Sequence, residues 1–201
     1  MSGEARRHGR FELARRFLVE RLPNGIDPDH GWRITDRYIN GTRLRLRRAE
    51  HLSGNETLFK LGQKIVPLPP NYSRTTITNI YLSADEYVAF NGLPARELRK
   101  CRYSTSYGGR SVAVDVFGAQ LTGLILAEIV FETSDEMKAS GSVPPWVERE
   151  VSCQIQFTGG ALATLTPQEA TNLVHQLSSG CSANRDVGRG APYRHRRRGI
   201  S

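Results

Sequence analysis

Apolar and polar residues alternate along much of the middle of the chain. Between positions 42 and 48 the sequence T-R-L-R-L-R-R puts two leucines on one face of an extended segment. Arg43, Arg45 and Arg47 fall on the other face, because successive side chains of a strand point to opposite sides. This pattern predicts a strand with an apolar back and a cationic front.

Five further segments have the alternation or the composition of strands, and glycine-rich stretches separate the last three. They are 58–66, 75–82, 98–103, 111–117 and 124–132. Within the first of them, Lys60 and Lys64 share a face. We therefore expect strands to dominate the fold.

Helix start signals occur at three places between and after these segments. Ser83 with Glu86 three residues later forms a capping box, and a second short helix is expected near Ser134. The last helix is predicted to begin at Thr166, an N-cap followed by proline, and to end at Gly180. Together the elements indicate an all-β or α+β domain.

Basic residues are in excess over the whole chain. The formal net charge of +8 favours anionic partners, because it raises the local concentration of phosphate-bearing ligands. Residues 181–201 are rich in arginine and poor in large apolar side chains, so we expect a disordered tail there. We expect residues 1–10 to form a flexible basic N-terminus and residues 11–180 to form a single domain.

Three cysteines, Cys101, Cys153 and Cys181, lack the Cys-x-x-Cys spacing of a zinc site and are odd in number, so no disulfide framework is indicated. No apolar run approaches the ~18 residues of a membrane-spanning helix, and no secretory signal is seen at the N-terminus. We therefore expect a cytoplasmic protein without a membrane partner.

The basic side chains of the predicted strands recur at alternate positions, with few acids among them. They are Arg16, Arg45, Arg47, Lys60, Lys64, Lys100 and Arg102. For a single strand, a solvated outer face is the common explanation. Solvated faces ordinarily mix both signs of charge, so the bias favours a second interpretation, in which these side chains line the lumen of a closed barrel and bind a polyanion.

Two carboxylates interrupt otherwise apolar segments. Asp115 alternates with valines, and Glu128 lies within the run L-I-L-A-E-I-V-F. A carboxylate in such surroundings is costly unless it is paired or bound to a metal. Two alternatives stay open: a buried salt bridge to an arginine, or a ligand of a hard divalent cation that also binds phosphate oxygens.

Several segments occur in an order that resembles the CYTH family, also called the triphosphate tunnel metalloenzymes, which includes thiamine triphosphatases and class IV adenylate cyclases. They are F-E-L-A-R-R-F-L-V, R-L-R-L-R, K-L-G-Q-K, Y-L-S-A-D-E-Y, L-R-K-C-R-Y, V-D-V-F-G-A-Q-L-T-G-L-I-L-A-E-I-V-F, P-P-W-V-E-R-E-V and F-T-G-G-A-L-A. The resemblance extends from about Phe11 to Ala163. It implies a closed eight-stranded antiparallel β-barrel with a few short helices and a C-terminal helix.

The resemblance also implies a function and a set of site residues. Members bind inorganic triphosphate, nucleoside triphosphates or thiamine triphosphate, and most hydrolyse them with Mg²⁺ or Mn²⁺. Glu12 matches the first acid of the opening Glu-x-Glu-x-Lys signature and Arg16 stands for its lysine, while Asp115 and Glu128 match later acids. The resemblance thus implies that Glu12 and Glu128 are catalytic, that Glu12, Asp115 and Glu128 bind the metal, and that the basic residues bind the substrate.

Four positions depart from the family pattern by losing charge. Ala14, Thr76 and Val130 stand where carboxylates are expected, and Gln156 replaces a basic residue. Two hypotheses follow: a metal-dependent triphosphatase, or a phosphate-binding module with an impaired metal site. Non-specific nucleic-acid binding through the tail is a third, less favoured, alternative, because no nucleic-acid-binding motif accompanies it.

Overall fold

Eight consecutive strands form the body of the molecule in the computed structural model, which describes residues 9–67, 71–141 and 143–183. They are β1 (Arg10–Val19), β2 (Gly31–Ile39), β3 (Leu44–His51), β4 (Thr57–Ile65), β5 (Arg74–Leu82), β6 (Ala95–Tyr107), β7 (Arg110–Phe117) and β8 (Ile125–Phe131). Every neighbouring pair is antiparallel.

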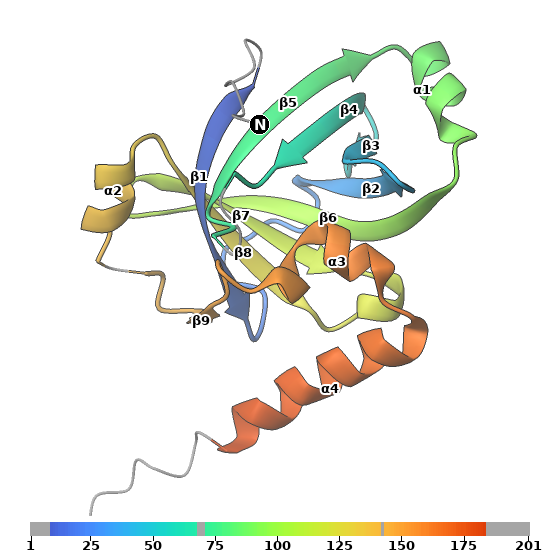
Figure 1. The fold of residues 1–201 in the computed structure, drawn as a ribbon. Helices are drawn as coiled ribbons and strands as arrows, with labels where there is room; N and C mark the ends of the chain where they lie inside the picture. Colours follow the sequence, from blue (N-terminus) through green and yellow to red (C-terminus); the bar gives the residue numbers. More distant parts are fainter. Residues whose placement is uncertain (1–8, 68–70, 142, 184–201) are drawn as a thin grey trace, which may run out of the picture.

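The sheet closes on itself. Its strand order is β5-β4-β3-β2-β6-β7-β8-β1, and β1 pairs again with β5, where Glu12 lies opposite Thr75. A short strand, β9 (Val147–Glu150), pairs with β1 beside this closed ring. The result is the closed eight-stranded antiparallel barrel that the family resemblance implies (Figure 1).

Four α-helices accompany the barrel within the described residues: α1 (Ala84–Asn91), α2 (Ser134–Ala139), α3 (Gly159–Thr164) and α4 (Pro167–Ala183). The capping box of Ser83 and Glu86 is present at the start of α1. Helix α2 begins at Ser134, where a helix start was expected. Its N-cap is Thr133, whose hydroxyl accepts from the Glu136 backbone N–H.

The predicted end of the last helix at Gly180 is wrong, because α4 continues to Ala183. A glycine inside a helix costs about 1 kcal/mol relative to alanine, which weakens a helix without ending it. The predicted domain boundary at 180 stays a prediction. Positions 184–201 of the predicted tail and positions 1–8 of the predicted N-terminus lie outside the described residues.

Strand β2 was not expected from the sequence. Its segment G-W-R-I-T-D-R-Y-I places Ile34, Asp36 and Tyr38 on one face, and both Ile34 and Asp36 are buried. An acid between apolar residues obscures the simple alternation from which half-buried strands are predicted. This polar inner face has its explanation in the barrel lumen.

Two apolar clusters surround the lumen and leave much of it free for polar side chains. One covers the outer face of β1, β7 and β8, where Phe17, Val112 and Val114 are almost fully buried and Met137 of α2 packs against them. The other cluster closes the end of the barrel against which α3 and α4 pack, and includes Phe117. Figure 1 shows α2 beside the barrel and α4 below it. Within the described parts of the chain, no helix is both long and apolar enough to cross a membrane.

Candidate functional site: a cationic cavity inside the barrel

A cavity of about 530 Å³ occupies the barrel lumen. Eight basic and two acidic side chains of the described residues line it: Arg10, Arg16, Arg43, Arg45, Arg47, Lys60, Lys64 and Arg102, with Glu12 and Glu128. Six of the seven basic residues predicted from strand alternation are among them, whereas Lys100 is not. Arg10 and Arg43, at or beside strand ends, were not proposed from the sequence, although Arg43 shares the face of Arg45 and Arg47.

Strand β4 presents its cations to the lumen with a glycine between them. Lys60, Gly62 and Lys64 all line the cavity, because alternate residues share a face. A Cβ added to Gly62 would lie 2.8 Å from Oδ1 of Asn79 and 3.7 Å from Nη2 of Arg45. The absence of a side chain at this position therefore keeps space for the Asn79 side chain, whereas the contact with the guanidinium would be ordinary.

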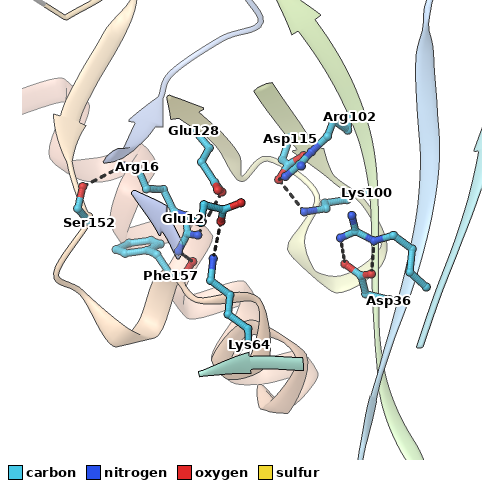
Figure 2. Close-up of polar contacts among 11 residues, drawn as sticks. Glu12, Arg16, Asp36, Lys64, Lys100, Arg102, Asp115, Glu128, Ser152 and Phe157 are labelled. Carbon is cyan, nitrogen blue, oxygen red and sulfur yellow. Dashed lines mark hydrogen bonds and ion pairs between the residues drawn. The ribbon is translucent and has the colours of Figure 1, made fainter. Parts of the chain in front are cut away.

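The two lining carboxylates are each paired with a cation (Figure 2). Arg16, directly opposite Glu128 across β1 and β8, donates from Nη2 to Glu128 Oε2 at 3.2 Å and from Nη1 to the Phe157 carbonyl at 3.2 Å. Lys64 donates to Glu12 Oε1 at 3.1 Å. Ala14 separates Glu12 from Arg16 on this face of β1, so with Arg10 the opening strand offers the lumen one carboxylate and two cations.

Glu128 remains ionised far below neutral pH. Burial raises its pKa, but the nearby charges of Arg16, Arg102 and Lys64 more than offset that effect and lower the pKa to about 2. An ionised carboxylate is the form that a hard cation binds. Glu128 is therefore suited electrostatically to the predicted metal role.

Asp115 lies in the barrel wall and does not line the cavity. Its Oδ2 accepts from Lys100 Nζ at 2.6 Å, and Arg102 donates to both of its oxygens at 2.6 and 2.7 Å. Burial raises the Asp115 pKa, but Arg102 and Lys100 outweigh it and hold that pKa well below its usual range. Of the two alternatives left open by the sequence, a buried salt bridge or a metal ligand, the structure shows the salt bridge for Asp115.

Lys100 is sequestered in the same cluster. Burial is the main cause that lowers its pKa, to about 8, while Asp115 acts in the opposite direction. Its ammonium contacts Asp115 and lies 5.6 Å from the centre of the Phe117 ring. Lys100 therefore does not contribute directly to the lining, in contrast to its predicted role as a substrate ligand.

Asp36 is a site residue that the sequence analysis missed. It is 1% exposed and accepts two hydrogen bonds from Arg47, at Oδ1 and Oδ2, both at 2.7 Å. Arg45 Nε is 3.5 Å away from Oδ1 and, among the described residues, has no hydrogen-bond partner. Burial raises the pKa of Asp36, but Arg45 and Arg47 more than compensate and lower it. Asp36 alternates with Ile34 and Tyr38 in the sequence, and this alternation could have predicted that Asp36 faces inward.

The three predicted metal ligands do not come together as one ligand set. Within the described residues, no group of three histidine, cysteine, aspartate or glutamate side chains could hold a metal ion. Glu12 and Glu128 remain at the cavity, whereas Asp115 is behind Lys100 and Arg102. Two carboxylates suffice where phosphate oxygens and water complete the coordination of Mg²⁺. The donor set therefore fits a cation that binds together with its substrate.

The structure revises one of the four departures from the family pattern. On β5 the cavity is lined by Thr75, Ile77 and Asn79, so Thr76 faces away from it. Val130 has the same phase as Glu128 and lies opposite Ala14, so both of those positions belong to the lumen face. Gln156 is exposed and bonded to Gln154.

No protein-family model and no curated protein matches the chain. Among solved structures, two crystal structures of NE1496, one of them described as an inorganic triphosphatase, have 25% sequence identity to this chain at a TM-score of 0.54. The matches cover 78% of this chain and 96% and 99% of those chains. The PH1819 protein of Pyrococcus horikoshii matches 64% of this chain and 83% of its own, with 16% identity and a TM-score of 0.46. With its closed barrel and its similarity to NE1496, this chain has the triphosphate-tunnel fold of the CYTH family, which confirms the resemblance carried by its sequence motifs.

Proposed function

We propose that this protein binds the triphosphate group of a small molecule in the barrel lumen and hydrolyses it with the help of Mg²⁺ or Mn²⁺. The substrate is inorganic triphosphate, a nucleoside triphosphate or thiamine triphosphate. The observation that carries the proposal is the charge of the cavity lining, eight basic side chains against two carboxylates. The similarity to NE1496, described as an inorganic triphosphatase, supports the same substrate class.

Arginine is the principal cation of this lining, and its chemistry suits phosphate. A planar guanidinium can donate two parallel hydrogen bonds to phosphate oxygens, and charge-assisted bonds are stronger than neutral ones. The buried Nε of Arg45, which has no hydrogen-bond partner among the described residues, is a donor that still requires an acceptor, and a phosphate oxygen or water can supply one. The cavity of about 530 Å³ is within the usual range of small-molecule sites.

Glu12 and Glu128 are the residues that would hold the divalent cation. Both line the cavity, and each is now paired with a cation that phosphate could attract away from it. A bound cation would neutralise phosphate charge and lower the pKa of a bound water. The chain's own contribution is to position the triphosphate with Arg16 and Lys64 and with the two arginines of β3 that line the cavity, Arg45 and Arg47.

A non-catalytic phosphate-binding module is the second candidate. It is favoured by the two lumen positions without a carboxylate, Ala14 and Val130, and by the absence of a three-ligand metal cluster in the described residues. In that case binding would persist without metal, because the arginines and lysines need no cation to attract phosphate.

Phosphate release from tripolyphosphate, ATP and thiamine triphosphate tests hydrolysis. We expect release with Mg²⁺ or Mn²⁺, loss of release with EDTA, and at least a hundredfold lower rate in Glu12→Gln and Glu128→Gln. Glu148→Gln, on the exposed face of β9, is the matched control and should keep the wild-type rate. A wild-type protein that binds these compounds but releases no phosphate with either metal would favour the binding module instead.

A further inference from the structure

Two buried aspartates bind arginines that stand directly opposite them on neighbouring strands. Asp36 of β2 pairs in register with Arg47 of β3, and Asp115 of β7 pairs in register with Arg102 of β6. In both pairs the arginine donates from Nε and Nη2 to the two carboxylate oxygens, at 2.6 to 2.7 Å. The same bidentate arrangement thus occurs at two places in the barrel wall.

These contacts leave part of each guanidinium free. A guanidinium has five N–H donors, and the aspartate uses one on Nε and one on Nη2. The remaining three donors, two on Nη1 and one on Nη2, are the edge available to a ligand. Arg47 and Arg102 both line the cavity, whereas Asp36 and Asp115 do not. Each aspartate therefore holds its arginine from behind.

We propose that Asp36 and Asp115 are positioning residues, which fix the guanidiniums of Arg47 and Arg102 in the orientation that binds phosphate, and that Asp115 is not a metal ligand. This inference rests on the proposed triphosphate site. The charges agree with it, because both oxygens of Asp115 already accept short hydrogen bonds from Lys100 and Arg102. A long side chain that is fixed before binding loses less conformational entropy when the ligand arrives.

Binding without metal separates positioning from metal coordination. We would measure tripolyphosphate binding in EDTA by calorimetry for wild type, Asp36→Asn and Asp115→Asn, with Asp135→Asn on the exposed surface of α2 as the control. Asparagine keeps the shape of aspartate but loses the charge and one acceptor. We expect the Kd of both variants, Asp36→Asn and Asp115→Asn, to rise about tenfold or more, because a mobile arginine binds less well, while the control keeps the wild-type Kd.

A second readout is the metal concentration that gives half-maximal phosphate release or, for a non-catalytic protein, half-maximal enhancement of binding. This midpoint should be unchanged in Asp115→Asn, because the carboxylate acts on phosphate through Arg102. A raised midpoint with an unchanged Kd in EDTA would make Asp115 a metal ligand and overturn the proposal.

Arginine variants keep the test decisive if an aspartate variant fails to fold. Arg47→Lys and Arg102→Lys retain the charge but lose the bidentate fork, so their Kd should also rise about tenfold. Asp36→Asn should then add little in the Arg47→Lys background, because both changes remove one interaction. Wild-type affinity in the lysine variants, or additive effects in the double variant, would overturn the inference. A wild-type protein that binds no triphosphate would refute the proposed function, and the inference with it.

Discussion

At the scale of single residues, the acids of the barrel interior fall into two groups that differ in position. Asp36 and Asp115 are behind arginines in the wall, whereas Glu12 and Glu128 reach the cavity. An isolated buried charge is costly, so each acid needs its cation to be stable there. The same pairing holds the arginines that remain available to phosphate.

The pairing of Glu128 predicts how stability depends on acid. Its pKa is about 2 in the folded protein and near 4.5 in the unfolded chain. Between these values the unfolded state binds more protons, so the free energy of unfolding falls as pH falls. Between pH 5.5 and pH 3, the free energy of unfolding measured with urea should fall by about 2 kcal/mol less in Glu128→Gln than in wild type. An identical pH dependence in the two proteins would contradict the depressed pKa.

The register of β5 and β8 predicts where a new carboxylate would matter. Val130 shares the lumen face of Glu128 and is 47% exposed, so Val130→Glu can be accommodated near the existing acids. We expect the metal affinity of the Val130→Glu protein, measured from the metal dependence of phosphate release, to rise about tenfold, because affinity for a hard cation depends on the number of charged ligands. Thr76→Glu faces away from the cavity and is the matched control. An equal gain in both variants would show that the assigned lumen face is wrong.

At the scale of elements, the α3 segment lies against one part of the tunnel lining. Thr158, Gly159 and Gly160 line the cavity beside Tyr38 of β2, and Arg16 bonds the nearby Phe157 carbonyl. A Cβ on Gly159 would overlap the Tyr38 hydroxyl, whereas one on Gly160 would make ordinary contacts of 3.8 and 3.9 Å with the ring. Close approach, and not helix propensity, therefore requires glycine at position 159.

Alanine substitutions in α3 test this packing. Gly159→Ala should lower the melting temperature, because the added methyl group overlaps the Tyr38 hydroxyl and forces Tyr38 or α3 to move. It should also weaken tripolyphosphate binding, because both line the cavity. Gly160→Ala gains helix propensity of up to about 1 kcal/mol and should be neutral or stabilising. Thermal unfolding and calorimetry measure both effects. Equal melting temperatures for the two variants would refute the close contact.

Elements differ in how well the sequence predicts them. The strand with Arg45 and Arg47 was predictable, because its apolar and cationic faces alternate cleanly. Strand β2 was not, because Asp36 occupies an inward position that is polar only inside a charged lumen. The position of Thr76 was misjudged because the register between β1 and β5 depends on barrel closure, which local alternation does not determine.

At the scale of the whole molecule, the barrel reverses the usual distribution of apolar and charged residues between interior and exterior. Apolar clusters lie on its outer wall and close one end, while the interior between them carries charge. A lumen with an excess of positive charge, enclosed by low-dielectric walls, concentrates the field on an anionic ligand. The one-sided arginines and lysines predicted this arrangement. Of the three acids predicted for the site, Glu12 and Glu128 line the cavity, whereas Asp115 does not.

Calorimetric binding of tripolyphosphate in EDTA tests this arrangement most directly. The informative comparison is wild type, the lumen variant Arg45→Gln/Lys60→Gln and the outer-face variant Arg33→Gln/Arg99→Gln, which removes the same charge from exposed positions. We predict that wild type and the outer-face variant bind with similar Kd, and that the lumen variant binds at least a hundredfold more weakly, since each charge-assisted bond contributes about 1.5–3 kcal/mol. Equal weakening in both variants would show that phosphate senses only the net charge, and would contradict a binding site inside the barrel.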